Sequence, residues 1–352
     1  NPELELFQDD VQTNPVDTST GKTSALIGQP FSFSKRRTFA QQAADFEMEA
    51  ARADFEATNR RTLATARRYF ITIIASRELA RTHRTLLADA ENLAAIAAEK
   101  GIPQEVARAR QLVLHEDLDV TAATANLVYA SHQLRWLLAG KLPEGYSLRA
   151  TFDRPGFDGI SSLSAANLVA EQPEIIAAEF REKAARRRIS EARAQRIPDP
   201  TFRAGGGIDN RTDEGYAALG LSIPLPLWNR NGARMSERNA EAEMLTAQTA
   251  ELTFSRRHEI EDLVLRLNEY DTLAELTAEG LLPAVAESAR LAREQYAAGS
   301  GTFLEALDAY RTHAQAATDS VVRLQELNQV YSDILATLPA ESVRRTEFLV
   351  PE

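Results

Sequence analysis

Residues that could bind a metal or catalyse a reaction are few in this chain. The absence of cysteine excludes disulfide bonds, a thiol nucleophile and thiolate ligands within this sequence, and the three methionines are too sparse for a thioether site. The histidines show no spacing typical of metal ligands, so we expect each to be a packing or surface residue. They are His83, His115, His132, His258 and His313. The sequence therefore predicts no catalytic residue, no cofactor and no metal site.

Two short patterns invite a chemical interpretation that the rest of the sequence does not support. The glycines at 205–207 suggest a phosphate loop, but no Gly-Lys-Ser/Thr motif follows and the context is a strand. His132 with Asp117 or Glu116 suggests a general base, yet nothing supplies a nucleophile. We expect the arginines at 186–188 to lie on a solvated helix face or near lipid headgroups. Function must therefore be sought in the architecture.

Composition narrows the class of protein. The chain has 352 residues, is 44% apolar and 26% charged, and carries a net charge of −11. This acidic balance argues against nucleic-acid binding, which needs a basic surface. No apolar stretch approaches the ~18 residues of a membrane-spanning helix.

The same succession of elements occurs twice in the sequence. Each copy opens on an Asn/Asp-Pro step in a strand-like segment, continues in an apolar segment containing proline, and enters a long helical run. The run reaches a glycine, from which a second helix turns back. These landmarks are Asn1, Pro2, Pro30 and Gly101 in the first copy, and Asp199, Pro200, Pro224, Pro226 and Gly299 in the second. The repeat predicts a duplicated strand–strand–long helix–helix unit.

The helical runs are unusually long and have narrow apolar seams. From about residue 36 to residue 99 no proline or glycine occurs, and at ~1.5 Å per residue such a helix is roughly 95 Å long. Small or apolar residues recur with the alternating four- and three-residue spacing of a coiled coil. In the first run they are Phe39, Ala43, Phe46, Ala50, Ala53 and Ala57, and in the last helix Leu324, Leu327, Tyr331, Ile334 and Leu338.

The strand-like segments alternate in polarity. Residues 216–227 place apolar side chains on one face and small or polar ones on the other, and residues 201–208 repeat this more weakly. The pattern is typical of membrane β-strands, although a half-buried strand of a water-soluble protein has the same alternation. Four strands cannot close a barrel, and hydrocarbon does not tolerate an open sheet edge. If these strands cross a membrane, several chains must share one barrel.

Two segments resemble a known family. Residues 221–232 (LSIPLPLWNRNG) resemble the strand-to-helix signature of the heavy-metal branch of TolC-type outer membrane factors, the CzcC-like proteins. Residues 296–311 (YAAGSGTFLEALDAYR) resemble the periplasmic tip of that family, a Tyr-x-x-Gly turn followed by Leu-Glu/Asp-x-Leu-Asp-Ala. The opening Asn-Pro-Glu-Leu also fits. The resemblance covers nearly the whole chain.

The resemblance implies a mixed, mostly α-helical fold and a homotrimer. The trimer would form an outer-membrane β-barrel with four strands per protomer, continuous with a long periplasmic α-barrel of coiled-coil helices. It would be the exit duct of a tripartite efflux system in a Gram-negative outer membrane and not an enzyme. Its partners would be outer-membrane lipid, a periplasmic adaptor (membrane fusion protein) and an inner-membrane resistance-nodulation-division pump. The substrates implied are heavy-metal cations such as cobalt, zinc, cadmium, copper or nickel.

Candidate site residues fall in three groups. Glu305 and Asp308 lie one helical turn apart and share a face; by resemblance they line the periplasmic mouth as acidic rings, and Tyr296 helps to hold that mouth closed. The periplasmic tip turns contain Gly101, Pro103, Gly299 and Gly301. The strand-to-helix bends contain Pro30, Pro224, Pro226 and Asn229, the last as a helix cap.

These assignments divide the chain as follows. The first repeat covers residues 1–140, with strands at about 2–9 and 24–33 and a helical hairpin at about 36–139, and residues 141–172 form an equatorial connection. The second covers residues 173–339, with an upper helix at about 173–197, strands at about 199–209 and 215–227 and a hairpin at about 230–338, and residues 340–352 form a C-terminal equatorial tail. The first repeat lacks an upper helix and a signal peptide, so we expect a precursor with at least about 25 further helical residues and an export signal upstream.

Two alternatives remain open at the level of sequence. The same duct could export drugs or polypeptides, because substrate choice in such systems is made mostly by the pump. A structural coiled-coil interaction protein without a pore belongs to a different class, and it would not depend on detergent.

Overall fold

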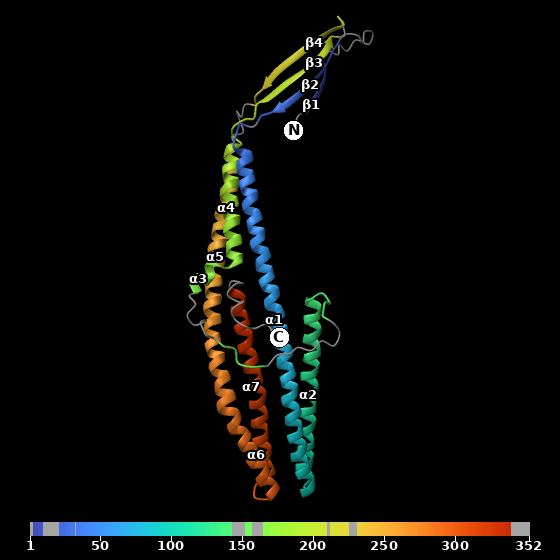
Figure 1. Cartoon of the computed structure of the whole chain (residues 1–352), viewed down its shortest axis with the longest axis vertical. Helices are drawn as coiled ribbons and strands as arrows, with labels where there is room; N and C mark the ends of the chain where they lie inside the picture. The colour runs from blue at the N-terminus through green and yellow to red at the C-terminus, as the bar shows by residue number, and fades with distance from the viewer. Residues whose placement is uncertain are drawn as a thin grey trace, which may run out of the picture. The chain divides into compact units, whose positions relative to one another are not determined.

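The computed structural model describes residues 3–9, 21–31, 33–142, 152–156, 165–209, 212–224 and 231–338 (Figure 1). Its elements are β1 (Glu3–Asp9), β2 (Lys22–Pro30), α1 (Arg36–Lys100), α2 (Pro103–Leu137), α3 (Ala165–Ala170), α4 (Pro173–Ala194), β3 (Thr201–Asp209), β4 (Glu214–Ser222), α5 (Gly232–Glu275), the π-helix η1 (Leu276–Leu281), α6 (Leu282–Ala298) and α7 (Phe303–Thr337). The fold is mostly helical with one small sheet, as predicted. No helix within these residues is long and apolar enough to cross a membrane.

The chain forms two compact units that do not coincide with the two sequence repeats. One unit comprises Asn1–Asp54 and Pro173–Leu252, and the other comprises Phe55–Gln172 and Thr253–Glu352. Each repeat therefore contributes to both units. The C-terminal tail predicted at 340–352 lies outside the described residues.

The first unit contains an antiparallel sheet in the order β1-β2-β3-β4 (Figure 1). Its register aligns Leu4 with Ile27, Ile27 with Ala204, and Ala204 with Leu219. Because paired residues point to the same side of a sheet, the apolar sets of all four strands share one face. The alternation predicted for residues 201–208 and 216–222 is therefore confirmed. The opposite face carries polar groups, among them Arg203 and Glu5, whose side chains form an ion pair at 3.0 Å.

Glycines in β3 permit the strands to approach closely. A Cβ atom on Gly205 would overlap the carbonyl oxygen of Ala25, and one on Gly206 would lie 2.7 Å from the carbonyl oxygen of Tyr216. The glycines at 205–207 lie in a paired strand rather than in a phosphate-binding loop, as the sequence context indicated.

The last strand is shorter than its alternation predicted. β4 ends at Ser222, opposite Thr201 at the start of β3, whereas the pattern continued to about residue 227. Pro224 follows the end of the strand, and a proline has no N–H to donate to a ladder. Pro30 is likewise the last residue of β2. Pro226 and Asn229, predicted at the same bend, lie outside the described residues.

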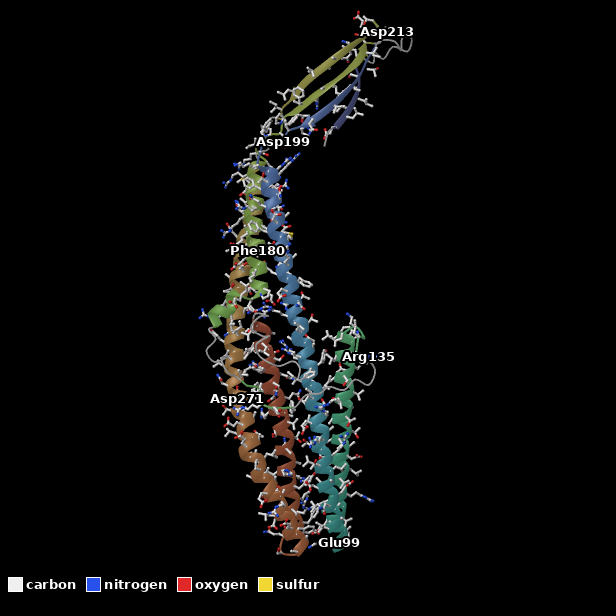
Figure 2. All side chains as sticks on the ribbon, in the orientation of Figure 1. Glu99, Arg135, Phe180, Asp199, Asp213 and Asp271 are labelled. Carbon is white, nitrogen blue, oxygen red and sulfur yellow. The ribbon has the colours of Figure 1, made fainter. Side chains whose placement is uncertain are left out.

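Helices α1, α4 and α5 contact one another in the first unit. The rings of Phe46 on α1 and Phe180 on α4 stack with their centroids 6.2 Å apart. Figure 2 labels Phe180 on α4. Arg188 on α4 pairs with Glu47 of α1 and with Glu241 of α5. Arg188 therefore links three helices, which corrects the expectation for this residue, whereas Arg186 and Arg187 are exposed on a helix face, as expected.

Small and apolar seams hold the helices together. Along α1, Ala43, Ala50 and Ala57 are buried, as the coiled-coil spacing predicted. In the second unit Leu327, Tyr331 and Ile334 of α7 are buried at the predicted positions.

A π-helical turn interrupts the long helical run of the second repeat. η1 joins α5 to α6, and the Leu282 N–H donates to the carbonyl of Thr277, five residues earlier. Pro283 follows in the first turn of α6. Its ring would clash with the carbonyl four residues earlier in a regular α-helix, and a wider turn relieves that clash.

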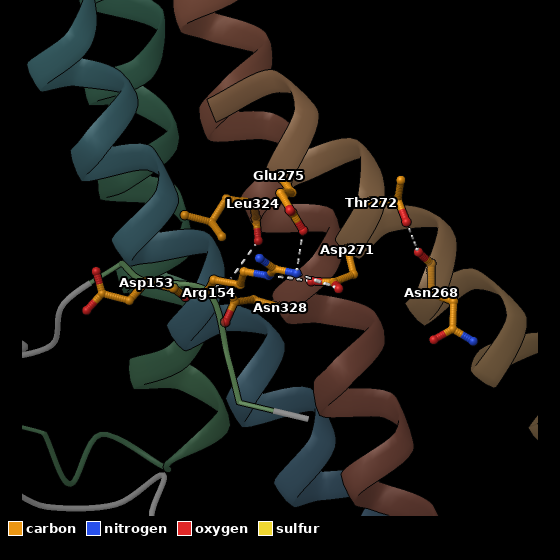
Figure 3. Close-up of polar contacts among 8 residues, drawn as sticks. All are labelled: Asp153, Arg154, Asn268, Asp271, Thr272, Glu275, Leu324 and Asn328. Carbon is orange, nitrogen blue, oxygen red and sulfur yellow. Dashed lines mark hydrogen bonds and ion pairs between the residues drawn. The ribbon is translucent and has the colours of Figure 1, made fainter. Parts of the chain in front are cut away.

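The connection between α2 and α3 crosses α5 and α7 at residues 152–156 (Figure 3). The Arg154 guanidinium donates to both carboxylate oxygens of Asp271 at 2.5 and 2.7 Å, and to Glu275 at 3.0 Å. The Asn328 side chain of α7 donates to the Asp153 carbonyl at 3.3 Å. The carboxylates raise the pKa of Arg154, chiefly through the hydrogen bond to Asp271. These contacts fix the segment against two helices.

The glycine requirement in β3 is testable with a single methyl group. We expect Gly205→Ala to lower the free energy of unfolding by about 1–3 kcal/mol, because its Cβ would overlap the backbone of β2. The measurement is the thermal unfolding midpoint of detergent-solubilised protein. Gly220→Ala is the matched control, because its Cβ would meet only the Arg203 Cβ, at 3.8 Å. Equal midpoints for the two variants would contradict the close approach.

Candidate functional site: the paired hairpin ends

The first helical hairpin turns at Gly101. α1 ends there because Gly101 adopts a left-handed conformation, with φ of 69°. Its N–H donates to the carbonyls of Ala97 and Ala98, both at 3.2 Å. Pro103 begins α2, where its missing N–H leaves no hydrogen bond unmade.

The second hairpin turns at Gly299, whose φ is 78°. The N–H groups of Ser300 and Gly301 both donate to the carbonyl of Gln295 at 3.0 Å, which closes the last turn of α6. α7 then begins with a capping box: the Glu305 N–H donates to the Thr302 hydroxyl, and the Thr302 N–H donates to the Glu305 carboxylate at 2.8 Å. We refer to residues 100–103 and 298–303, with the helical turns beside them, as the hairpin ends.

A shared apolar core joins the two hairpin ends. Buried residues from α1, α2, α6 and α7 contribute to it, and several of them are alanines, so the helices can approach closely. They include Leu86, Ala90, Leu93, Ala97, Ala109, Leu112, Tyr296, Phe303, Ala306, Leu307 and Tyr310. The Tyr310 hydroxyl donates to the Leu86 carbonyl at 2.9 Å, and this hydrogen bond ties α7 to α1.

Tyr296 is the polar centre of this junction. Only 2% of its surface is exposed, and its hydroxyl donates to the Glu105 carboxylate on α2 at 2.6 Å. The ring meets Phe303 edge to face with centroids 5.5 Å apart, and the Lys100 ammonium lies 4.5 Å from the ring centroid. Burial, together with the Glu105 carboxylate, raises the pKa of Tyr296. Tyr296 therefore stays a hydrogen-bond donor at neutral pH.

Glu305 and Asp308 do not join this buried network. Both are exposed in the first turns of α7, while Phe303, Ala306 and Leu307 face the core. The N–H of Thr302 lowers the pKa of Glu305, with a further contribution from the Thr302 hydroxyl. Glu305 is therefore ionised at neutral pH and serves as a helix cap as well as a surface charge.

Sequence reasoning missed several partners at the hairpin ends. Glu105 and Lys100 were not expected to contact Tyr296, and the ion pair of Arg293 with Asp89 at 2.5 Å was also not foreseen. Each contact joins residues far apart in the sequence, so spacing carries no signal of it. One group among the described residues has the composition of a metal site: His83, Glu116 and Asp119. The signal of this group in the sequence is the three-residue spacing of Glu116 and Asp119, which places both acids on one face of a helix.

Comparison with known proteins gives concordant results. Residues 165–332 match the family described as outer membrane efflux protein. The cobalt-zinc-cadmium resistance protein CzcC of Cupriavidus metallidurans is 24% identical over 325 residues, which cover 90% of this chain and 75% of that protein. The solved outer-membrane channel OprN superposes with a TM-score of 0.80 at 17% identity and covers 96% of this chain and 80% of its own. CusC superposes with a TM-score of 0.80 at 16% identity, over 96% of this chain and 82% of its own.

Residues 165–332 therefore match the outer membrane efflux proteins, a class of channels and not of enzymes, and the fold of the chain is that of outer-membrane channels. The similarity to CzcC agrees with the heavy-metal branch that residues 221–232 indicated.

The contact between Tyr296 and Glu105 should be energetically coupled. We expect Tyr296→Phe to lower the free energy of unfolding by about 1–2 kcal/mol, because the ring remains while the hydrogen bond is lost. In a Glu105→Ala background the same change should cost much less. Denaturant unfolding of all four proteins measures this, with Tyr129→Phe on an exposed face of α2 as the control. Strictly additive losses would show that the two residues do not interact.

Proposed function

We propose that this chain is one protomer of a homotrimeric exit duct in a Gram-negative outer membrane. The observation that carries the proposal is the four-stranded sheet with one exposed apolar face and an outer strand at each side. In an isolated chain such a sheet would expose both apolar surface and unpaired backbone groups to its surroundings. A barrel shared by three copies removes both costs.

The two faces of the sheet suit the two environments of a barrel wall. Leu6 and Leu219, on the apolar face, are 74% and 79% exposed, which is unfavourable in water and favourable against lipid. The other face bears the Arg203–Glu5 ion pair at 3.0 Å and the Lys22–Asp209 pair at 3.7 Å. A charged face of this kind fits a water-filled lumen.

The edges of the sheet explain why several copies are needed. β1 and β4 are the outer strands, and each has a partner on one side only within the described sheet. Joining β4 of one copy to β1 of the next makes a head-to-tail interface that closes into a ring. Three copies give about twelve strands, between the packed eight-stranded and the open sixteen-stranded barrels.

The helices also leave apolar surface available for neighbouring copies. Large side chains are exposed on α1, α2 and α5; they include Phe55, Trp136, Phe254 and Leu265. Contacts between helices of adjacent protomers would cover such residues and form a periplasmic α-barrel. The proposal assigns the hairpin ends to the periplasmic mouth of that barrel, where a periplasmic adaptor and an inner-membrane pump of the resistance-nodulation-division type would dock.

Heavy-metal cations are the favoured substrates. The similarity to CzcC supports this choice, and the net charge of −11 suits a conduit for cations. Exposed Glu305 and Asp308 would form two acidic rings at the mouth of a trimer, and Tyr296 would hold the hairpins that carry them. Export of drugs or polypeptides through the same duct is the competing substrate class.

The trimeric barrel can be tested by cross-linking the outer strands. The 352-residue sequence has no cysteine, so Leu6→Cys in β1 with Leu219→Cys in β4 adds two thiols to a region that has none. A short bifunctional thiol reagent should link the full-length protein in detergent into dimers and trimers and nothing larger. Leu6→Cys with Ala25→Cys is the control, because these residues pair within one sheet and should react within one chain. Only monomers, or a ladder beyond three chains, would overturn the shared barrel.

The acidic mouth can be tested by conductance. We expect Glu305→Gln with Asp308→Asn to lower cation selectivity and multivalent-cation block in planar bilayers, since the exposed charges are removed. Glutamine can retain the capping box that alanine would destroy, so the helix start is preserved. The difference from the wild type should shrink as salt screens the charges.

The control for this experiment is Glu261→Gln with Asp262→Asn, the same change of charge on α5. A wild-type reversal potential in the hairpin-end variant would refute the mouth assignment while leaving the trimer intact. An equal shift in the control would refute it as well.

A further inference from the structure

A histidine and two acids meet between α1 and α2 in the second unit. His83 comes from α1, whereas Glu116 and Asp119 lie three residues apart on one face of α2. One ligand atom from each residue lies within 4.8 Å of the others. His83 Nδ1 is 3.2 Å from a Glu116 carboxylate oxygen. We propose that these three residues bind a divalent transition-metal cation that links α1 to α2.

The position of Glu116 is the strongest argument for a ligand. Its neighbours on the buried seam of α2 are apolar: Ala109, Leu112, Ala123 and Ala130. Glu116 occupies the same seam and is only 4% exposed. A buried carboxylate costs several kcal/mol unless it is paired. Glu116 is paired with His83 at 3.2 Å, and a carboxylate has acceptor capacity beyond one such contact, which a cation can use.

The charge of the cluster favours a cation. Two carboxylates with a neutral imidazole carry a charge of −2, and a protonated imidazole would still leave a net negative charge. A divalent cation neutralises the first state completely.

A groove gives an ion and its water ligands access to the cluster. The groove has a volume of about 790 Å³, and residues of α1, α2 and α7 line it. His115 also lines it, with its Nε2 3.8 Å from an Asp119 oxygen. His115 is therefore placed to supply a second imidazole. Three protein ligands with water in the remaining positions form a common arrangement for zinc.

The donor atoms select the kind of metal. One or two imidazole nitrogens and two carboxylates suit borderline cations such as Zn²⁺, Co²⁺ and Ni²⁺. Soft Cu⁺ prefers thiolates and thioethers, and this cluster contains neither. The proposal concerns an ion held in the helical wall rather than a transported one, so it does not depend on what the duct exports.

Bound metal would reinforce the helix packing beside the hairpin ends. It would join α1 and α2 close to Tyr310, whose hydroxyl already ties α7 to α1 through the Leu86 carbonyl. We therefore expect Zn²⁺ to raise the thermal unfolding midpoint of the protein, because a ligand that binds only the folded state stabilises it.

Metal binding to the full-length protein in detergent tests the site. Isothermal titration with Zn²⁺ should give one site per chain, and Co²⁺ should produce a d–d absorption band of the same stoichiometry. Asp119→Asn and Glu116→Gln should each weaken Zn²⁺ binding at least about tenfold and diminish the Co²⁺ band. Asp117→Asn with His132→Ala is the matched control, because both residues lie on α2 and are exposed outside the cluster.

The variants distinguish a loss of metal binding from a loss of folding. Asp119 is only partly buried, so Asp119→Asn gives a folded protein even if Glu116→Gln does not. The proposal fails if the wild type binds no Zn²⁺ in the micromolar range, or if Asp119→Asn binds it as the wild type does. It also fails if the control variant loses binding equally, since binding would then lie elsewhere. Loss in the cluster variants alone, with an unchanged oligomeric state, supports it.

Discussion

In the proposed barrel, the outer edges of β1 and β4, which have no partner within the described sheet, are the constraint on which the rest of the protein depends. A sheet in hydrocarbon cannot leave such groups without partners, and the apolar face bearing Leu6 and Leu219 calls for hydrocarbon. The proposed trimer meets both requirements, because its copies complete one another. The glycines at 205–207 serve the same end, because they let the backbones of β2, β3 and β4 approach within the wall.

The helices are held together by small-residue seams and by a few polar contacts. Alanine seams such as Ala43, Ala50 and Ala57 bring helix axes close but specify register weakly, since small side chains fit in more than one alignment. Polar contacts supply the missing specificity. The Arg154 fork on Asp271 and the Tyr296–Glu105 hydrogen bond each join segments distant in sequence. Exposed ion pairs add little stability, so their contribution here is to alignment.

Periodic features were predictable from the sequence, and contacts between helices were not. The uninterrupted helix α1, the alanine seam and the strand alternation each repeat within one segment, so one chain displays them in full. β4 ends near Pro224 and opposite Thr201, where its partner strand β3 begins. The alternation of apolar residues in β4 contains no information on either limit. His83 and Glu116 belong to different helices, and the histidine spacing therefore predicted a packing residue. The family resemblance predicted the mostly helical fold with its small sheet. The hydrogen bond between Tyr296 and Glu105 is seen only in the structure.

The π-turn η1 shifts the sequence frame of the buried seam by one residue. Along α5, Ile260, Leu267 and Ala274 are buried at intervals of seven residues. Continuing that count reaches Leu281, which is exposed, whereas Leu282 and Tyr296 pack in the shared core of the hairpin ends. The heptad frame thus advances by one residue at η1. In a regular α-helix of 3.6 residues per turn this residue would rotate the following seam by about 100°, and the wider π-turn absorbs it. A regular α-helical turn with the residue retained would rotate Tyr296 away from Glu105, so the irregular turn is what keeps both parts of the rod on one seam.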